Sequence, residues 1–332
     1  MTRGEFLGAV SAVALTGKRG FAGSQAGVAD TKETVPILFD TDIGNDIDDA
    51  IALSYLLKQP RCQLLGITTV SGDTAKRAAL AEALCRAAKK DNIPIHAGLT
   101  GPLLHGRGQS EVAQYKAIES TPHRTNFGAP SEAVLFLRDT IRKNPGKLTL
   151  LAVGPLTNIA ALFALDPEVP GLLKRVVLMC GVFTGGMASH GPGAREWNAL
   201  IDPVATGIVY RHAKPGTLLS VGLDVTEQCT LPVAECRTRF AQAGGPLALV
   251  LKLGEEWFKG APQVTFHDPL AAAMVFEPGI CQTQRGTINT STDDDKMQGM
   301  TAWAPMGDGP HTVASGVDKK RFFDHYFTVT GG

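Results

Sequence analysis

From Val35 onward, short apolar runs alternate with longer segments in which apolar residues recur about every three or four positions. The short runs predict buried strands, and the periodic segments predict amphipathic helices. The predicted strands cover residues 35–39, 63–70, 93–95, 148–153, 175–180 and 217–221. The predicted helices cover residues 50–57, 74–89, 131–144, 156–165 and 269–275, with one more that begins at Asp202 and Pro203.

Strands that alternate with helices predict an α/β fold with an open, mostly parallel central sheet and helices on both faces. In such sheets, ligands bind at the carboxyl ends of the strands. Polar turns between Cys281 and Trp303 predict an appended hairpin. Ser131 and Asp202 are the expected N-caps of their helices. Because no domain boundary is visible after residue 35, we predict a single domain over residues 35–332.

Residues 1–34 have a different pattern, which resembles a degenerate signal peptide. Arg3 precedes an apolar stretch from Phe6 to Leu15, and small residues follow it. The stretch is too short to span a membrane. Lys18 and Arg19 follow the apolar stretch, where a signal peptide prefers neutral residues. We therefore predict an exported, periplasmic protein, with a cytoplasmic protein that carries a disordered N-terminal segment as the alternative.

The charges of the chain balance, with 32 lysine and arginine residues against 32 aspartate and glutamate residues. Proteins that bind nucleic acid or acidic membranes usually present a basic face. We therefore expect a small-molecule partner, without nucleic-acid binding or membrane insertion. The six cysteines form no CxxC pair and lack zinc-site spacing, so buried thiols are expected. A disulfide between Cys229 and Cys236 is the alternative in an oxidising compartment.

The first predicted strand leads directly into an acidic segment, Asp40-Thr-Asp-Ile-Gly-Asn-Asp-Ile-Asp-Asp49, with five carboxylates in ten residues. Carboxylates this close repel one another unless a cation or a proton joins them. A hard cation with oxygen ligands is the natural solution. An EF-hand does not fit, because its loop requires Gly and Glu where this chain has Asn45 and Ile51.

The acidic segment is compatible with two alternative functions. A Mg²⁺-dependent phosphohydrolase of the haloacid-dehalogenase type also begins with Asp-x-Asp after its first strand, which would make Asp40 the nucleophile, with Thr68 or Thr69 at the end of the second strand. A catalytically silent protein that binds calcium or ribose on the same fold is the second alternative. The phosphohydrolase predicts turnover of phosphate esters, and the silent binder predicts ribose affinity without turnover.

The acidic segment, extended to Ala50, resembles the amino-terminal signature of the inosine-uridine preferring nucleoside hydrolases. Four further stretches resemble this family in the same order along the chain. They are Gly66-Ile-Thr-Thr-Val-Ser-Gly72, Gly154-Pro-Leu-Thr-Asn-Ile-Ala160, Val176-Val-Leu-Met179 followed by Glu196-Trp-Asn198 and Ile201-Asp-Pro203, and His267-Asp-Pro269. The resemblance spans roughly residues 35 to 330 and implies a nucleoside N-ribohydrolase that assembles as a homodimer or homotetramer.

The resemblance also implies a Ca²⁺ site. Asp42, Asp49 and Asp268 would supply side-chain oxygens, and Val153 would supply its backbone carbonyl. Water and two ribose hydroxyls would complete the roughly six to eight oxygens that calcium takes. Asp268 has an alternative structural role as the N-cap of the helix over residues 269–275.

In the implied reaction, a metal-held water attacks the anomeric carbon of a ribonucleoside through an oxocarbenium-like transition state. Asp42 would take the proton of this water. His267 would protonate the leaving base, although a histidine at the start of a helix can also have a purely structural role. The residues expected to bind the substrate are Asp48, Asp73, Glu196 and Asn198.

The chain departs from the family pattern in the acidic segment. Asn45 and Asp46 are two additional residues relative to the commonest form, and Ile43 replaces a usual proline. The assignment of Asp48 and Asp49 therefore rests on the Asp-Asp-Ala ending of the segment.

Further departures concern the substrate side of the site. Asp73 stands where the family often has asparagine, and residues 184–193 lack a counterpart to the usual ribose-contacting asparagine, for which His190 is a substitute. We expect this stretch and Trp257 to border the base pocket, with Trp257 either stacked on a nucleobase or packed in the core. The sequence leaves the base preference open.

Overall fold

Strand β1 (Val35–Thr41) lies inside the main sheet, and its Ile37, Leu38 and Phe39 side chains are fully buried. A run of consecutive apolar residues suits a strand whose two faces are both covered. The computed structural model describes residues 33–183, 195–293 and 296–331. Within this part of the chain, the residues from Thr34 onward form one compact unit.

The described residues form a nine-stranded sheet in the order β10-β9-β11-β6-β5-β4-β1-β2-β3. Neighbouring strands are parallel from β3 to β11, whereas β9 is antiparallel to β11 and to β10. The other strands of this sheet are β2 (Cys62–Thr69), β3 (Ile95–Ala97), β4 (Thr149–Ala152), β5 (Arg175–Met179), β6 (Leu218–Val221), β9 (Cys281–Thr290), β10 (Thr301–Pro305) and β11 (His311–Val317). A separate antiparallel pair contains β7 (Thr230–Pro232) and β8 (Gln263–Thr265).

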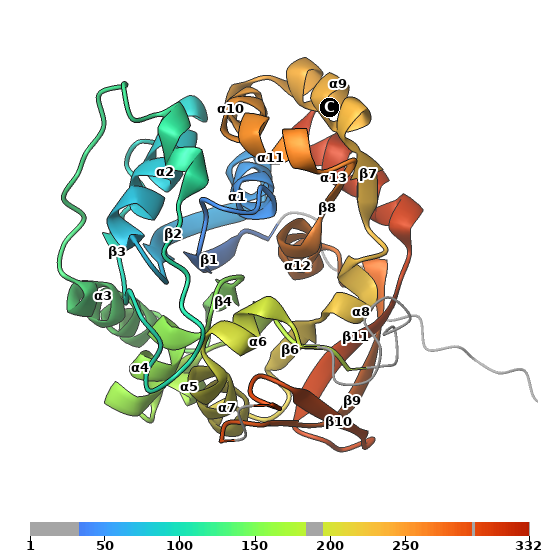
Figure 1. Cartoon of the computed structure of the whole chain (residues 1–332). Coiled ribbons are helices and arrows are strands. Elements are labelled where there is room, and N and C mark those ends of the chain that lie inside the picture. The colour runs from blue at the N-terminus through green and yellow to red at the C-terminus, as the bar shows by residue number, and fades with distance from the viewer. Residues whose placement is uncertain (1–32, 184–194, 294–295, 332) are drawn as a thin grey trace, which may run out of the picture. The chain divides into compact units, whose positions relative to one another are not determined.

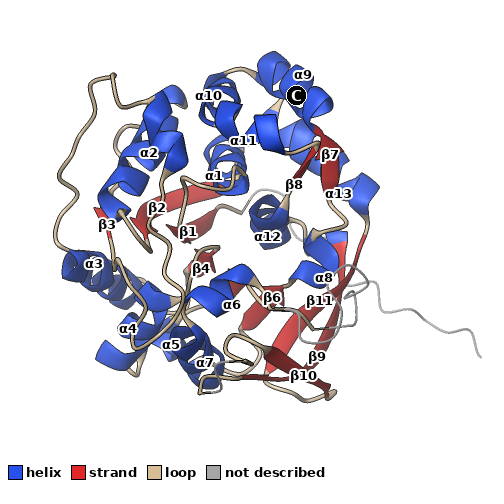
Figure 2. Cartoon of the chain, in the orientation of Figure 1, coloured by secondary structure: helices blue, strands red, loops and turns tan. Residues whose placement is uncertain are grey.

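Helices cover both faces of the main sheet, as Figures 1 and 2 show. One group is α1 (Asp48–Lys58), α2 (Thr74–Ala87), α9 (Val233–Ala243), α10 (Gly245–Leu253), α12 (His267–Phe276) and α13 (Lys319–Thr330). The opposite group is α3 (Pro130–Lys143), α4 (Thr157–Leu165), α5 (Val169–Leu172) and α7 (Pro203–His212). Shorter helices are α6 (Trp197–Ile201), α8 (Leu223–Thr226), α11 (Glu255–Gly260), and the 3-10 turns η1 (Ala113–Ala117) and η2 (Pro278–Ile280).

The strands supply alternate side chains to two hydrophobic cores, one on each face of the sheet. Phe39 and Leu151 belong to the core that includes α1, α2 and α12, whereas Leu38 and Leu150 belong to the core that includes α3, α4 and α7. This alternation follows from the two-residue period of a strand. The prediction of an α/β fold with a mostly parallel sheet and helices on both faces is confirmed.

The hairpin and one helix cap are as the sequence predicts, whereas a second cap and a disulfide are not. The hairpin expected between residues 281 and 303 is present as β9 and β10, and it extends the main sheet. Asp202 caps α7, and its side chain accepts a hydrogen bond from the backbone of Ala205. The Ser131 cap is wrong, because α3 begins at Pro130, which suits the first turn of a helix, and Ala129 occupies the cap position. The alternative of a disulfide is also wrong, since the described cysteines are free thiols.

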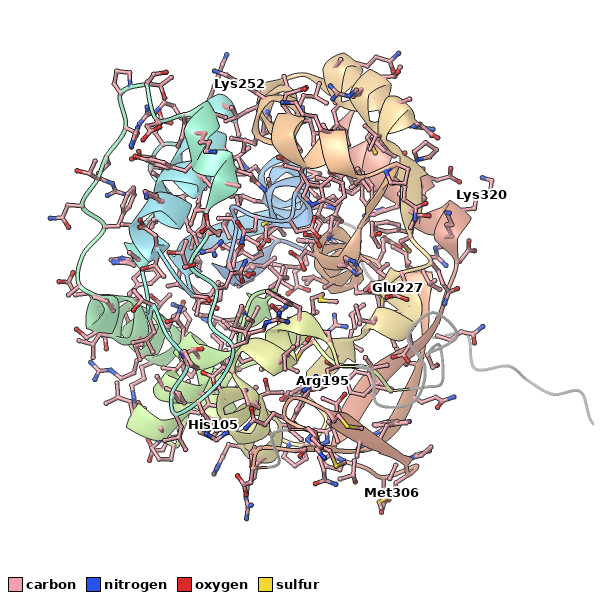
Figure 3. All side chains as sticks on the ribbon, viewed as in Figure 1. His105, Arg195, Glu227, Lys252, Met306 and Lys320 are labelled. Carbon is pink, nitrogen blue, oxygen red and sulfur yellow. The ribbon has the colours of Figure 1, made fainter. Side chains whose placement is uncertain are left out.

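Charged side chains such as Lys252 and Lys320 are exposed and point away from the core (Figure 3). Among the described residues, no helix combines the length and the apolar character that a membrane span requires.

The strand order creates a crevice beside β1. The chain passes from β1 through α1 to β2 on one side, whereas β4 pairs with the other side of β1. Such a reversal of strand order opens a gap at the carboxyl ends of the two strands, where ligands of α/β proteins bind. Asp42 follows β1 and Val153 follows β4, so both lie at this gap.

Candidate active site

The acidic segment forms a tight turn between β1 and α1. Gly44 has a φ angle of +136°, and a Cβ added at this position would lie 2.5 Å from Cγ1 of Val112. Glycine is therefore required here by both backbone conformation and space. The turn delivers Asp48 and Asp49 to the first turn of α1, where the partial positive charge of a helix N-terminus favours anions.

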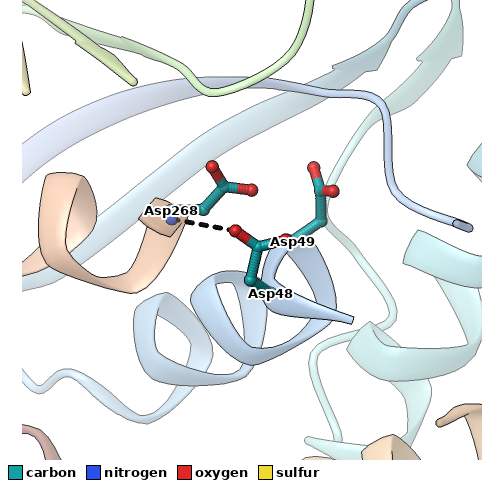
Figure 4. A group of neighbouring side chains, drawn as sticks. All are labelled: Asp48, Asp49 and Asp268. Atoms are coloured by element: carbon teal, nitrogen blue, oxygen red, sulfur yellow. Dashed lines mark hydrogen bonds between the residues drawn. The ribbon is translucent and has the colours of Figure 1, made fainter. Parts of the chain in front are cut away.

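A second helix start brings Asp268 to the same place (Figure 4). Helix α12 packs against α1, and the backbone N–H of Asp268 donates a hydrogen bond to Oδ2 of Asp48 at 3.2 Å. Carboxylate oxygens of Asp48, Asp49 and Asp268 lie within 4.8 Å of one another, and all three residues are buried. The alternative role of Asp268 as a helix cap is wrong, because Phe266 is the N-cap of α12 and Asp268 lies inside its first turn.

Asp48, Asp49 and Asp268 form a carboxylate cluster. The charged form of this cluster is electrostatically unfavourable without a bound cation. Burial raises the pKa of each of the three carboxyls well above the ordinary value, and repulsion from neighbouring carboxylates raises it further. Burial also raises the pKa of Asp42, and the Arg77 guanidinium opposes that shift. A cation among these oxygens would relieve the repulsion that otherwise favours protonation.

The donor atoms of the cluster fit a hard divalent cation. They are all carboxylate oxygens, and the group that the described residues bring together contains neither histidine nor cysteine. Calcium and magnesium prefer such oxygen ligands, whereas zinc sites usually include nitrogen or sulfur. The carbonyl of Val153 accepts a hydrogen bond from Nδ2 of Asn198 at 2.7 Å, and its second lone pair stays available for a metal.

The three residues of the cluster line a cavity of about 290 Å³. The residues predicted to act in catalysis or to bind the metal all line this cavity, and so do three of the four predicted to bind the substrate, namely Asp48, Glu196 and Asn198. The lining residues are Asp42, Asn45, Asp46, Asp48, Asp49, Gln109, Val153, Met179, Glu196, Trp197, Asn198, Leu223, His267 and Asp268.

Glu196 and Asn198 occupy the start of α6 beside the cluster. The Glu196 carboxylate caps the helix, accepting backbone hydrogen bonds from Asn198 at 2.7 Å and Ala199 at 2.9 Å, and a third from Gly181 at 3.2 Å. Burial raises the pKa of Glu196, and these three donors oppose the shift. Nδ2 of Asn198 donates to the carbonyls of both Val153 and Met179. Both amide hydrogens of Asn198 are therefore used, and its Oδ1 is the atom left to accept a hydrogen bond.

His267 begins α12 and is half-buried at the cavity wall. Its Nδ1 lies 2.7 Å from Oγ1 of Thr226 on α8, in a hydrogen bond that fixes the plane of the ring. An imidazole held in this way can exchange a proton with a group in the cavity.

The comparisons with known proteins agree with this geometry. A family model described as inosine-uridine preferring nucleoside hydrolase matches residues 37–324. The chain belongs to this family. The predictions of the family and of its class of enzyme are thereby confirmed, and members of the family depend on a metal ion.

Individual relatives cover nearly the whole chain. The chain is similar to the pyrimidine-specific ribonucleoside hydrolase RihA of Salmonella arizonae, with 30% identity over 313 residues, which cover 87% of this chain and 96% of the relative. It is similar to the structure of a purine-preferring ribonucleoside hydrolase from Gardnerella vaginalis, with 26% identity and a TM-score of 0.73 over 89% of this chain and 98% of that one. A plant nucleoside hydrolase has the same fold, with 24% identity and a TM-score of 0.74 over 90% of this chain and 99% of that one.

Asp40 does not occupy the position that a phosphohydrolase nucleophile would need. It is fully buried and is absent from the lining of the cavity. Its Oδ2 accepts hydrogen bonds from Thr68 at 2.5 Å and Asn158 at 2.7 Å, and burial raises its pKa to about 7. A fully buried carboxyl that does not line the cavity cannot attack a phosphate ester there. Membership of the nucleoside hydrolase family likewise disfavours this alternative.

Two residues that the sequence associated with the substrate lie elsewhere. Asp73 caps α2, accepts a hydrogen bond from the backbone of Lys76 and forms an ion pair with its side chain at 3.1 Å. Trp257 is partly buried against the core on α11, in edge contact with Phe258, and does not line the cavity. His190 and the rest of residues 184–194 lie outside the described residues.

Several residues that line the cavity were not predicted from the sequence. Trp197 is 44% exposed at the cavity wall, and its Nε1 donates to Oε1 of Gln109 at 3.2 Å. The Arg107 guanidinium lies 5.5 Å from the centre of the Trp197 ring. The position of Trp197 between Glu196 and Asn198 was a usable signal, whereas Gln109 comes from a loop without any periodic pattern.

Proposed function

We propose that the protein catalyses the Ca²⁺-dependent hydrolysis of the N-glycosidic bond of ribonucleosides, giving free base and ribose. The observation that carries this proposal is the convergence on one cavity of a buried carboxylate cluster, two further polar side chains on α6, and a histidine. The cluster comes from the two ends of the chain, since 220 residues separate Asp48 from Asp268.

The residues proposed to hold the calcium ion are Asp42, Asp49 and Asp268 through their carboxylates and Val153 through its carbonyl. Calcium is favoured over smaller magnesium because it accepts more oxygen ligands in less regular geometry. When bound, the ion would act as a Lewis acid that takes oxygen ligands, and it would thereby orient the attacking water and the ribose hydroxyls.

Asp42 is the proposed proton acceptor for the attacking water. Its carboxylate lines the same cavity as the other proposed calcium ligands, so it can meet a water that is held there. Asp48, Glu196 and Asn198 are proposed to bind ribose hydroxyls, with Asn198 limited to accepting through Oδ1 because its amide hydrogens are already used. As the glycosidic bond breaks, the ribose becomes cationic, and the surrounding carboxylates stabilise that charge.

His267 is the proposed proton donor to the leaving base. Its hydrogen bond to Thr226 holds the ring at the cavity wall, so the imidazole is positioned before the substrate arrives. A base that departs with a proton is a better leaving group than its anion, which lowers the barrier to bond cleavage.

Ribose release from a panel of purine and pyrimidine nucleosides tests the proposal. We expect release that EDTA abolishes and that added Ca²⁺ restores better than Mg²⁺. Asp49→Ala should abolish it, whereas Asp139→Ala, which removes an exposed carboxylate on α3, should not. No release from any nucleoside by a folded, calcium-loaded protein would refute enzymatic turnover, and ribose binding without turnover would identify a silent binder.

Assembly as a homodimer or homotetramer and export to the periplasm are further parts of the proposal, supported by the family resemblance and by the pattern of residues 1–34. Light scattering of the purified protein measures the first. Cell fractionation with N-terminal sequencing of the mature protein measures the second.

A further inference from the structure

The turn that carries the acidic segment is held by a fully buried arginine on α2. Nε of Arg77 donates to the carbonyl of Ser71 at 2.6 Å. One terminal nitrogen donates to the carbonyls of Asp42 and Ile43, the latter at 2.9 Å, and the other donates to the carbonyl of Glu111 at 3.3 Å. The guanidinium therefore joins three segments, namely the β1–α1 turn, the β2–α2 turn and the loop before η1.

The opposite side of the same turn is held by Gln114 on η1. Its Nε2 donates to the carbonyls of Asn45 at 3.1 Å and Asp46 at 2.6 Å, and its backbone N–H donates to the carbonyl of Gly44 at 2.9 Å. Gln114 is only 4% exposed. These bonds reach the two residues, Asn45 and Asp46, by which the segment is longer than the commonest form of the family.

The bonding pattern of Arg77 distinguishes positioning from simple charge compensation. A buried arginine usually pairs with a carboxylate through its planar fork. Here the hydrogen bonds that the fork donates end on backbone carbonyls, although Asp42 and Asp49 are close enough to interact with it electrostatically. The geometry of the guanidinium is thus used to fix the path of the backbone.

We propose that Arg77 and Gln114 are positioning residues of the active site, which hold the longer acidic turn in the shape that lets Asp42 and Asp49 meet one cation. The inference rests on the proposed function, because it assumes that the cation is the ligand of this turn. Arg77 fixes the start of the turn through the carbonyls of Asp42 and Ile43, and Gln114 fixes its middle. Loss of either anchor lets the carboxylates separate.

Calorimetric titration of the chelator-stripped full chain with Ca²⁺ tests this inference in Arg77→Met, Arg77→Lys and Gln114→Met. Positioning predicts a Kd raised at least tenfold in Arg77→Met and at least threefold in the other two. It also predicts that kcat falls more than KM rises when saturating calcium is restored. Lysine keeps the charge but cannot reproduce the planar fork, so it should not rescue binding fully. Arg175→Met is the matched control, since it removes a partly buried arginine that bonds to the carbonyl of Met274, and it should leave the Kd unchanged.

The direction in which the Ca²⁺ affinity changes when Arg77 is replaced distinguishes a positioning role from a purely electrostatic one. If Arg77 acted only as a positive charge that repels calcium, Arg77→Met would bind Ca²⁺ more tightly than the wild type, and Arg77→Lys would bind it with unchanged affinity. This result would overturn the inference. Wild-type affinity in all three variants would overturn it as well. If Arg77→Met does not fold, the neutral Gln114→Met decides the question. Absence of calcium binding by the folded wild type would instead refute the proposed function.

Discussion

Replacing Asp268 by asparagine should make the protein more stable without a divalent cation and less stable with one. The Asp268 side chain is 3% exposed, and its carboxylate lies within 4.8 Å of oxygens from Asp48 and Asp49. The influences on its pKa are burial and four neighbouring carboxylates, all of which act against its charge. Asparagine keeps the size and shape of the side chain and removes that charge.

The magnitude follows from the separation of the charges. Two unit charges 4.8 Å apart repel by about 3 kcal/mol at an effective dielectric constant of about 20. Asp268 takes part in two such repulsions, but the cluster relieves part of them by binding protons. We therefore expect Asp268→Asn to raise the free energy of unfolding by roughly 1 to 3 kcal/mol in EDTA. Calcium at about 100 times its Kd should add about 2.7 kcal/mol to the wild type and much less to the variant.

The stability of the metal-free protein should change with pH in a defined direction. The folded-state pKa of Asp268 is raised above the ordinary value of 3.8. The unfolded chain therefore loses its proton at lower pH than the folded chain does, and the stability of the metal-free wild type falls as pH rises above about 4. The fall should be smaller in Asp268→Asn, which has one carboxyl fewer to titrate.

Urea unfolding in EDTA and in saturating Ca²⁺, repeated between pH 5 and pH 8, measures these differences. Asp202→Asn is the matched control, because the Asp202 carboxylate is buried but accepts hydrogen bonds from Leu103, Thr157 and Ala205. It should lower stability by about 1 to 2 kcal/mol with or without calcium. If Asp268→Asn proved less stable than the wild type in EDTA as well, the repulsion assigned to the cluster would be wrong.

Three further substitutions test individual roles. His267→Ala should lower kcat on nucleosides by about 10²- to 10⁴-fold. It should have much less effect on kcat for a p-nitrophenyl riboside, because that leaving group needs no proton. An equal loss on both substrates would contradict the role of His267 as proton donor. Glu196→Gln should raise KM and lower the free energy of unfolding, measured in a denaturation curve, by about 1 to 2 kcal/mol. The reason is that one amide oxygen replaces the two carboxylate oxygens that accept three backbone hydrogen bonds. An unchanged unfolding curve would contradict this capping role of Glu196. Asn198→Asp should lower kcat/KM by at least about tenfold in steady-state assays, since it removes both donated bonds that hold the carbonyls of Val153 and Met179; wild-type kinetics would show that these bonds do not support the site.

Strands β1 to β6 were predictable because they are short runs of mostly apolar residues. The hairpin of β9 and β10 was expected only from the polar turns of residues 281–303, and β11 was not predicted. The helices α9, α10 and α11 between residues 233 and 260 were not predicted, because they follow one another without a strand between them, outside the alternation of strands and helices that marks the other helices. The Ser131 cap failed for a local reason, since the proline before it already starts the helix.

The metal-binding half of the candidate site was more predictable than the substrate half. Asp48 and Asp49 lie in one short segment at the end of a strand, so their position follows from the strand order. Asp73 follows the next strand, but its side chain is used to cap α2 and to pair with Lys76. Gln109 reaches the cavity only through the path of a long loop, which no local pattern encodes.

The helix termini explain how so many carboxylates can be buried together before a cation arrives. Asp48 and Asp268 both lie in the first turn of a helix, α1 and α12, where unpaired backbone N–H groups carry partial positive charge. The N–H of Asp268, which has no partner within its own helix, donates to the Asp48 carboxylate. Each helix start therefore stabilises an anion of the cluster, and the contact between α1 and α12 joins the two ends of the chain at the same point. The three carboxylates can then remain close together although they repel one another, which keeps Asp49 and Asp268 near enough to hold one cation while Asp48 lies beside them.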